Sequence, residues 1–508
     1  MPRPPAPRGT RPANMADVVL APGSDVAPAF VGTRGVVTRG GLRTDVEALS
    51  GWLAGQGVGR GDRVVLALPD GVPWVASFIA IVRIGAVAAL VAPSVDAARA
   101  TDLALRADPR LVLSDRDDLA VAPVAPVAGT AEVDAAMRSG PSARGAPSAS
   151  VRTTDPCYLL ATSGSTGPSK WVVHRHGDIP ACIATFGRSV MRLGPGDVTW
   201  SVAALATSYG LGNALYFPLG AGAAAWLGGG TDPAALATAC RLGGVTAVYG
   251  VPTFWARLAR HVREGRFDPG VLARVSHAGS AGENLPATVW NDVARDTGLR
   301  IVNGLGSSEA TNLYLSDTPG APRAGTVGWP VAGYDLCIDG RRPLPGDEGE
   351  LWVRGPTVMD GYLGDRDATA RALTGGWLRT GDRVRMEADR SFTFLGRLGD
   401  VIKVGALWVD PAHVQDVVLG DPEVADAVVL AAPDADGIDR LVAVVGSHAE
   451  PGWLEARLHG RCADLLPAHM VPRAVVVADH LPVTPSGKVR RDQVMTMATD
   501  RLAGAGAR

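Results

Sequence analysis

The stretch Thr162–Lys170 reads TSGSTGPSK and decides how the rest of the chain is interpreted. It follows a short apolar run, Cys157–Thr162 (CYLLAT), whose length and flanks predict a buried strand. Its glycines let the backbone turn back on itself, its hydroxyl groups supply hydrogen bonds, and a lysine ends it. Backbone N–H groups and hydroxyls in such a turn surround phosphate oxygens. The stretch therefore predicts a phosphate-binding loop. It is not a Walker A loop, because Trp171 follows Lys170 where serine or threonine would be needed.

Short apolar runs alternate with helical patterns on both sides of this loop. Arg63–Leu68 (RVVLAL), Gly244–Val251 (GVTAVYGV) and Leu299–Asn303 are predicted strands, and helical patterns lie between them. Strands that alternate with helices form layered domains with largely parallel sheets. We therefore expect an α/β fold for most of the chain.

The pattern changes towards the C-terminus. Alternating runs at Glu350–Arg354 (ELWVR) and Ser391–Leu395 (SFTFL) predict a small β-rich subdomain that completes the large domain. Beyond Gly396 the chain reads as a compact α+β unit. We expect three segments: a disordered leader over residues 1–16, in which Met15 is an alternative start, a large N-terminal domain over 17–396, and a small α+β C-terminal domain over 397–508.

Composition excludes several classes of protein. Of the 508 residues, 46% are hydrophobic and 20% are charged, which supports a globular chain with a sizeable core. A net charge of −2 argues against nucleic acid as the main partner. The five cysteines form no closely spaced pair, which favours a reducing, cytoplasmic setting without disulfides or structural zinc. No apolar run reaches the roughly 18 residues of a membrane helix, so no membrane partner is expected.

Five further motifs follow the loop in a fixed order: Asn303–Glu309 (NGLGSSE), Trp377–Asp382 (WLRTGD), Gly396–Lys403 (GRLGDVIK), Leu466–Pro472 (LPAHMVP) and Pro485–Lys488 (PSGK). Together with the loop they resemble the adenylate-forming superfamily, which contains acyl-CoA ligases, peptide-synthetase adenylation domains and luciferases. The resemblance spans roughly residues 17–494. It implies an N-terminal domain that binds adenylate and acyl group, and a mobile C-terminal lid.

The resemblance also implies roles for individual residues. Lys488, Lys170 and Ser308 would be catalytic, with Lys488 stabilising the charge that develops during adenylation. Glu309 would help to hold Mg²⁺, Asp382 would grip the ribose hydroxyls, and Arg397 would lie near the ribose and phosphate. The nucleotide site as a whole would comprise Thr162, Ser163, Gly164, Ser165, Thr166, Gly167, Gly282, Glu283, Asn284, Asn303, Gly304, Leu305, Asp382 and Arg397.

Three segments resemble the benzoate-type aryl-CoA ligases in particular: Tyr209–Asn213 (YGLGN), Tyr249–Thr253 (YGVPT) and Ser280–Pro286 (SAGENLP). The acyl pocket would be formed by Tyr209, Gly210, Ser280 and Gly306. An aromatic acid is implied, and the small residues at these turns leave a bulky cyclic acid from secondary metabolism equally open.

The implied chemistry has two steps. The carboxylate is first joined to AMP from ATP with Mg²⁺, and the thiol of coenzyme A then displaces AMP. In the superfamily the C-terminal domain rotates about a hinge between these steps, and here the hinge residue would be Gly399. A homodimer is left open, since dimers are common in this branch.

Two departures from the family pattern concern adenylation. Glycine normally follows the loop lysine, and the sequence leaves two positions open for the indole of Trp171. It either crowds the β- and γ-phosphates of ATP or turns away onto the sheet. The loop that serves thioester formation is also altered, in the segment of Lys403, Gly405, Ala406 and Trp408. These changes lead to the hypothesis that adenylation is weakened or lost. The chain would then act on an acyl-AMP made by a separate adenylating enzyme.

Other functions share these motifs. An ordinary two-step ATP-dependent acid–CoA ligase is the first alternative, and a free-standing adenylation enzyme that loads a carrier protein is the second. A binding module that has lost catalysis is disfavoured, because Lys488, Glu309 and Asp382 are retained. A luciferase-like oxygenase rests on superfamily analogy alone.

Overall fold

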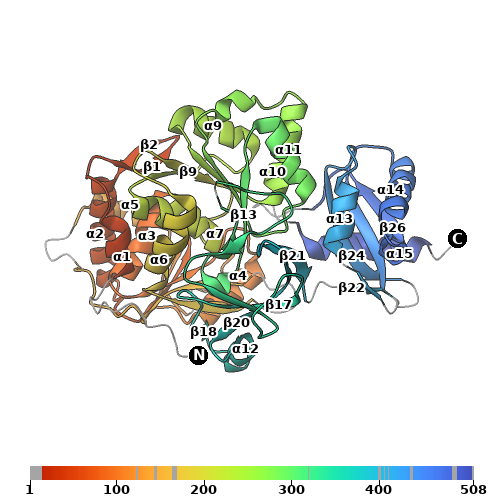
Figure 1. The fold of residues 1–508 in the computed structure, drawn as a ribbon. Helices are drawn as coiled ribbons and strands as arrows, with labels where there is room; N and C mark the ends of the chain where they lie inside the picture. The colour runs from red at the N-terminus through yellow and green to blue at the C-terminus, as the bar shows by residue number, and fades with distance from the viewer. Residues whose placement is uncertain are drawn as a thin grey trace.

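The computed structural model describes residues 14–121, 124–141, 146–162, 169–318, 320–398, 402–404, 407–409, 411–434, 439–482 and 489–505. Within these residues the chain forms a large α/β body and a smaller α+β lobe beside it (Figure 1). The α/β class expected from the alternation of strands and helices is confirmed.

The large body is built on two mainly parallel sheets. The first has nine strands in the order β15-β14-β13-β12-β11-β9-β10-β1-β2 and the second has seven in the order β18-β8-β7-β4-β3-β5-β6. The strands of the first sheet are β1 (Pro28–Gly32), β2 (Gly35–Thr38), β9 (Val198–Ser201), β10 (Ala224–Trp226), β11 (Ala247–Gly250), β12 (His277–Ser280), β13 (Ile301–Gly306), β14 (Leu313–Ser316) and β15 (Trp329–Pro330). Those of the second are β3 (Arg63–Ala67), β4 (Val87–Leu90), β5 (Leu111–Ser114), β6 (Val127–Ala128), β7 (Pro156–Ala161), β8 (Trp171–Arg175) and β18 (Gly361–Tyr362).

Helices cover both sheets and bury their apolar faces against them. The apolar residues of these two layers form three buried clusters, the largest of which joins the two sheets. The helices of the large body are α1 (Met15–Leu20), α2 (Arg39–Gly55), α3 (Val72–Arg83), α4 (Ala97–Arg106), α5 (Thr130–Arg138), α6 (Asp178–Cys182), α7 (Ser208–Leu211), α8 (Phe217–Ala221), α9 (Pro233–Gly243), α10 (Pro252–Arg263), α11 (Ala287–Thr297) and α12 (Arg366–Ala372), with π-helical segments η1 (Ile183–Met191) and η2 (Gly212–Tyr216) and 3-10 turns η3 (Pro269–Leu272) and η4 (Ser308–Ala310).

A third, antiparallel sheet confirms the β-rich subdomain that the sequence predicts. Its strands are β16 (Asp335–Ile338), β17 (Glu348–Arg354), β19 (Leu373–Thr374), β20 (Trp377–Met386) and β21 (Phe392–Arg397). β21 ends at Arg397, next to the expected domain boundary, and the division at 396 and 397 stays a prediction.

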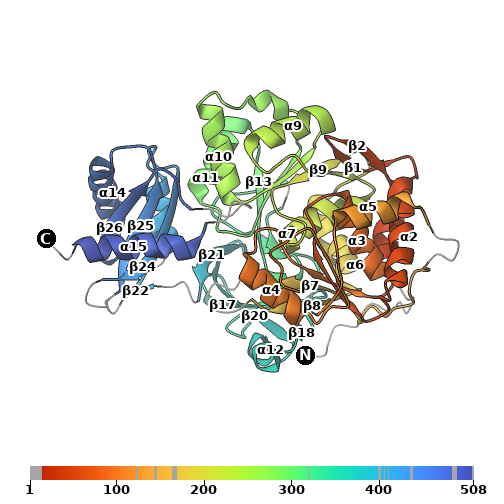
Figure 2. The ribbon, with the colours of Figure 1, turned by 180° about the vertical axis from the view of Figure 1, so that it is seen from behind.

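The C-terminal lobe forms its own small core around β24 (Asp426–Pro433), β25 (Asp439–Gly446) and β26 (Ala474–Ala478). It also contains β22 (Ile402–Val404), β23 (Leu407–Val409), α13 (Pro411–Leu419), α14 (Pro451–Leu465), the 3-10 turn η5 (Ala468–Met470) and α15 (Arg491–Ala505). Figures 1 and 2 place the lobe beside α11 and β21, and α13 contacts both.

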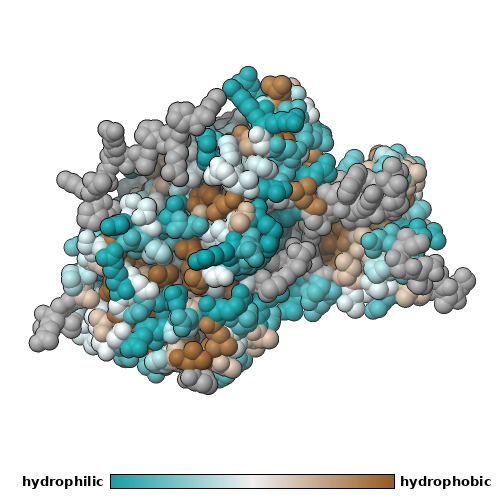
Figure 3. Space-filling model, turned by 90° about the horizontal axis from the view of Figure 1, so that it is seen from below, coloured by the Kyte–Doolittle hydropathy of each residue, from teal (hydrophilic) through white to brown (hydrophobic). Residues whose placement is uncertain are grey.

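The surface carries no broad apolar band in the view of Figure 3, where hydrophobic patches are small and separated by hydrophilic residues. No helix in the described part of the chain combines the length and the apolar character that crossing a membrane requires.

The disordered leader expected over residues 1–16 extends too far along the chain. Residues 1–13 lie outside the described part, but Asn14, Met15 and Ala16 are buried at the start of α1. The Asn14 side chain caps this helix by accepting from the Ala16 N–H and donates to the Arg83 carbonyl at 2.9 Å. A side-chain N-cap supported by a tertiary contact makes these three residues part of the fold.

The buried His176 ring makes stability depend on pH. It is fully buried, its Nδ1 accepts from the Met15 N–H at 3.3 Å, and burial lowers its pKa to about 4. Because the unfolded chain binds a proton near pH 6.5, the free energy of unfolding is highest above that pH and falls as the pH drops towards 4, by about 3 kcal/mol. His176→Gln is expected to flatten this slope in denaturant titrations at pH 4.5–7.5. A slope as steep as in the parent protein would show that His176 is not its source.

Candidate functional site

The ends of the predicted phosphate loop are held together at the β7–β8 hairpin. The Thr162 N–H donates to the Lys170 carbonyl at 2.9 Å, and the Lys170 N–H donates to Thr162 Oγ1 at 3.0 Å. Ser163, Gly164, Ser165, Thr166 and Gly167 lie outside the described residues. The hairpin therefore fixes where the loop leaves and re-enters the sheet.

Lys170 and Glu309 both contact the side chain of Tyr362, Lys170 at the ring face and Glu309 at the hydroxyl. The Lys170 Nζ lies over the Tyr362 ring, 5.3 Å from its centroid, and the Tyr362 hydroxyl donates to Glu309 Oε1 at 2.8 Å. Burial and the neighbouring Glu309 raise the pKa of Tyr362, so this phenol stays protonated as a donor. No motif in the sequence indicated Tyr362, because β18 is a two-residue strand that returns from the β-rich subdomain to pair with β8.

The turn that carries Ser308 and Glu309 rests on a buried polar network. His174 is fully buried on β8, with Nε2 2.7 Å from the Ser308 carbonyl and Nδ1 3.0 Å from Asp178 Oδ2. The Thr311 hydroxyl lies 2.9 Å from the same Nδ1. Thr311 has a φ of +64°, a conformation that is costly for a β-branched residue. The network holds this strained turn in place.

Two turns that carry predicted nucleotide-binding residues, 281–284 and 303–305, lie side by side. Ser280, at the end of β12, pairs with Asn303 on β13, so the turn 281–284 starts next to Asn303–Leu305. Gly282 has a φ of +90° and open space where a side chain would stand. Asn303 Oδ1 and Ser307 Oγ are buried without a hydrogen-bond partner. Unpartnered polar atoms at this junction suit a ligand such as a nucleotide.

Asp382 and Arg397 form one pair in this structure. The carboxylate of Asp382 is wholly buried, with Oδ1 3.0 Å from Arg397 Nε and Oδ2 accepting from the Tyr314 hydroxyl at 2.9 Å. Burial is the main reason that the pKa of Asp382 is raised. The structure therefore brings these two residues together, and their roles towards ribose and phosphate stay predictions. For Asp382 to bind ribose hydroxyls, the Arg397 side chain must move aside.

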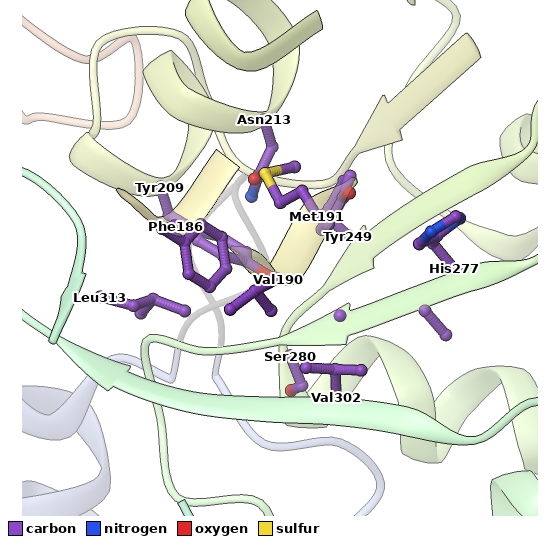
Figure 4. A pocket seen from close by; sticks show the side chains of 12 residues that line it. Phe186, Val190, Met191, Tyr209, Asn213, Tyr249, His277, Ser280, Val302 and Leu313 are labelled. Carbon is purple, nitrogen blue, oxygen red and sulfur yellow. The ribbon is translucent and has the colours of Figure 1, made fainter. Parts of the chain in front are cut away.

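A pocket of about 380 Å³ lies beside these turns (Figure 4). Figure 4 shows Leu313 at one end of its lining and His277 at the other. It is mainly apolar, and η1 contributes much of its wall; π-helical segments are frequent at functional sites. The lining residues are Phe186, Val190, Met191, Tyr209, Asn213, Tyr249, His277, Ala278, Gly279, Ser280, Val302 and Leu313.

Tyr209 and Ser280 line this pocket as predicted, but Gly210 and Gly306 do not. A Cβ at Gly210 would lie 2.0 Å from the Ala204 carbonyl oxygen, and one at Gly306 2.4 Å from the Asn312 carbonyl oxygen. Both glycines are therefore required for close backbone packing. The sequence did not indicate that residues of η1 line a pocket, because an amphipathic helical segment has the same pattern whether it covers a core or a pocket.

Several predicted site residues lie outside the described part of the chain. These are Lys488, the hinge residue Gly399, and Gly405 and Ala406 of the predicted thioester loop. Lys403 and Trp408 are paired across the β22–β23 hairpin, and of these two residues only the backbone is described.

Trp171 does not point towards the nucleotide site. Its side chain is 2% exposed and packs in the core between the second sheet and α4, and its Nε1 donates to the Leu103 carbonyl at 2.9 Å. Alternation along β8 places Trp171 and Val173 on one face and His174 on the other. The interpretation that the indole crowds the phosphates of ATP is therefore wrong, because strand alternation directs it into the α4 core.

Comparison with known proteins gives the family. Residues 21–363 match the model of the AMP-binding enzyme family, and residues 413–488 match that of the AMP-binding enzyme C-terminal domain. The chain belongs to the AMP-binding, adenylate-forming enzymes. It is 32% identical to the 4-hydroxybenzoate–CoA/benzoate–CoA ligase of Rhodopseudomonas palustris, over 94% of this chain and 92% of that protein.

Other relatives fall in the same branch. The crystal structure of the anthranilate CoA ligase AuaEII in complex with anthranoyl-AMP superposes with a TM-score of 0.88 at 26% identity, covering 96% of this chain and 98% of that one. The p-hydroxybenzoic acid–AMP ligase FadD22 of Mycobacterium tuberculosis is 32% identical over 91% of this chain. This chain spans 65% of the length of FadD22.

Proposed function

We propose that this AMP-binding enzyme is an acid–CoA ligase that converts an aromatic carboxylic acid to its CoA thioester through an acyl-adenylate. The observation that carries the proposal is the apolar pocket beside the two turns 281–284 and 303–305. Its Ser280 end adjoins the turn 281–284, so a carboxylate at that end would face a nucleotide bound there. The aryl-CoA ligases among its relatives support the same substrate class.

The side chains around the pocket support an acid with one ring rather than a bulky polycyclic acid. Phe186 and Met191 are buried side chains that bound the pocket. A flat aromatic ring would fill this space and gain the full benefit of apolar burial.

In the first half-reaction a carboxylate oxygen of the acid attacks the α-phosphorus of ATP and pyrophosphate leaves. Ser308 would donate to the α-phosphate, and Lys170 would pair with the outer phosphates near the start of β8. Glu309 is suited to hold Mg²⁺, which usually takes one or two carboxylates and completes its shell with phosphates and water. No cluster of three ligating side chains occurs in the described residues, which agrees with such a site. Bound Mg²⁺ would neutralise phosphate charge.

In the second half-reaction the thiol of coenzyme A attacks the acyl carbonyl carbon and AMP leaves. Asp382 would hold the ribose through both steps once Arg397 has moved aside. We place Lys488 with the first step and the segment of Lys403 and Trp408 with the second, after rotation about Gly399. These assignments rest on the family resemblance.

We further propose that adenylation is retained, so that the chain needs no partner to supply an acyl-AMP. The buried indole of Trp171 removes the main reason to expect a weakened first step. Purified protein with ATP, Mg²⁺, coenzyme A and an aromatic acid should yield acyl-CoA by mass spectrometry. Product from synthetic acyl-adenylates alone would contradict the proposal.

The relative FadD22 is named as an acid–AMP ligase, a name that specifies the adenylate and no thiol acceptor, so an enzyme that loads a carrier protein is the rival function. The two functions share the whole nucleotide site and differ in the thiol acceptor. Replacing coenzyme A by a phosphopantetheinylated carrier protein in the same assay separates them. Faster transfer to the carrier would favour the rival function.

Tyr362 is expected to orient Glu309 for Mg²⁺. Tyr362→Phe keeps the ring under Lys170 and removes the hydrogen bond to Glu309. A hydrogen bond to a charged group contributes about 1.5–3 kcal/mol. We therefore expect the Mg²⁺ concentration for half-maximal pyrophosphate exchange to rise about tenfold. Tyr334→Phe, which removes a buried hydroxyl bonded to Thr357, is the matched control. An unchanged Mg²⁺ dependence in Tyr362→Phe would exclude this role.

A further inference from the structure

We propose that the acid carries a hydroxyl or amino group on the edge of its ring opposite the carboxylate, and that Tyr249 and His277 recognise this group. The inference rests on the proposed function and specifies its substrate further.

The direction of the pocket follows β12. Ser280 is the last residue of this strand and adjoins the turn 281–284, whereas His277 is its first residue. With a rise of about 3.3 Å per residue, their Cα atoms stand about 10 Å apart. Both residues line the pocket, and Figure 4 shows His277 at one end of the lining. A benzoic acid whose carboxylate lies near Ser280 would therefore direct its para position towards His277.

Tyr249 brings an unsatisfied hydroxyl to this pocket. The residue is 5% exposed, and its hydroxyl is buried without a hydrogen-bond partner. Its ring lies against Gly279, where a Cβ would come within 2.7 Å of Cδ1. Tyr249 pairs with Gly279, two residues from His277 on β12, and both Tyr249 and His277 line the pocket.

His277 is a second polar group on the same face of the sheet. Ala247 on β11 pairs with His277, and Tyr249 pairs with Gly279, so His277 and Tyr249 project from the same face of neighbouring strands. The His277 ring is half-buried, and its Nδ1 lies 2.8 Å from Ser276 Oγ. Among the described residues, Nε2 has no partner. It can therefore bind a ligand together with the Tyr249 hydroxyl.

The rest of the lining makes this polar end selective. Val190, Met191 and Val302 offer no hydrogen bonds to a ring substituent. Benzoate would leave the Tyr249 hydroxyl buried and unpaired, and a para-methyl or para-chloro group would also displace any water beside it. A para-hydroxyl or para-amino group gives the Tyr249 hydroxyl a hydrogen-bond partner. A site built to hydrogen-bond a substrate group discriminates strongly against analogues that lack the group.

The experiment compares kcat/KM for CoA thioester formation from benzoate, 4-hydroxybenzoate, 4-aminobenzoate, 4-methylbenzoate and the 2- and 3-hydroxy isomers. We expect 4-hydroxybenzoate or 4-aminobenzoate to exceed benzoate by about ten- to a hundredfold. In Tyr249→Phe this ratio should fall about tenfold, whatever the change in the rate with benzoate itself. His277→Leu should lower the ratio in the same direction. Tyr334→Phe, a buried tyrosine outside the pocket, should leave it unchanged.

The two proposals fail in different ways. A preference for benzoate, 4-methylbenzoate or the 2-hydroxy isomer in the parent protein would overturn the inference and leave the ligase function standing. A ratio that Tyr249→Phe does not alter would do the same. Absence of thioester from every aromatic acid would overturn the proposed function itself.

Discussion

Replacing Trp171 by glycine is expected to destabilise the protein by about 3–5 kcal/mol and to give no gain in ATP–pyrophosphate exchange. The indole fills the core between the second sheet and α4 and donates to the Leu103 carbonyl. Removing a buried tryptophan leaves a cavity of that cost, and glycine in a strand adds to it. Urea unfolding monitored by circular dichroism measures the loss.

This prediction separates two views of the same residue. If Trp171 crowded the phosphates of ATP, glycine would speed exchange and change stability little. Trp255→Gly is a matched control, because Trp255 is equally buried, its Nε1 bonds to the Gly279 carbonyl, and it belongs to another core cluster. Faster exchange in Trp171→Gly, with normal stability, would contradict the structural account.

Replacing His174 by leucine is expected to lower kcat/KM for adenylation about a hundredfold and to cost about 3–5 kcal/mol of stability. The Ser308 carbonyl loses its partner at 2.7 Å, and the buried carboxylate of Asp178 loses its contact with the ring. The Ser308 carbonyl and the Asp178 carboxylate each lose a partner at about 1–3 kcal/mol, and a displacement of about 1 Å in a catalytic turn costs about a hundredfold in rate.

Further variants and ligand-binding measurements distinguish a loss of folding stability from a displacement of the turn that carries Ser308. His174→Gln keeps an amide that can donate to the Ser308 carbonyl, and it should recover part of the rate. His176→Gln alters a second fully buried histidine two residues along, which contacts Met15 rather than the turn, and it should leave the rate near that of the parent at pH 7.5. Binding of adenosine should survive in His174→Leu while binding of ATP with Mg²⁺ weakens. Equal loss of both ligands would indicate general unfolding.

Much of the fold could be predicted from local patterns. The run Cys157–Thr162 corresponds to β7, which spans Pro156–Ala161, and the alternating run Glu350–Arg354 lies within β17. Both are short apolar or alternating segments with clear flanks, for which periodicity is informative. Asp382 and Arg397 belong to two separate motifs and lie on different strands, yet the structure pairs them.

Side-chain direction and tertiary contacts were harder to predict. The sequence shows a large residue at Trp171 but not which face of β8 its side chain occupies. Because the indole lies on the face that packs against α4, it does not crowd the phosphates of ATP. Tyr362 reaches Glu309 only because β18 pairs with β8 across almost two hundred positions of sequence. The apolar pocket depends on η1, whose pattern is equally that of a core helix. Asn14–Ala16 are ordered by Arg83 and His176, both distant along the chain.

The central claim is that this chain activates an aromatic acid itself before thioester formation. The most direct test is ATP–pyrophosphate exchange by the purified protein with Mg²⁺, with and without 4-hydroxybenzoate and without coenzyme A. The account predicts exchange that depends on the acid, because adenylation is reversible and needs no thiol. No acid-dependent exchange, together with thioester formation from synthetic 4-hydroxybenzoyl-AMP and coenzyme A, would show that the first step has been lost and would contradict the account.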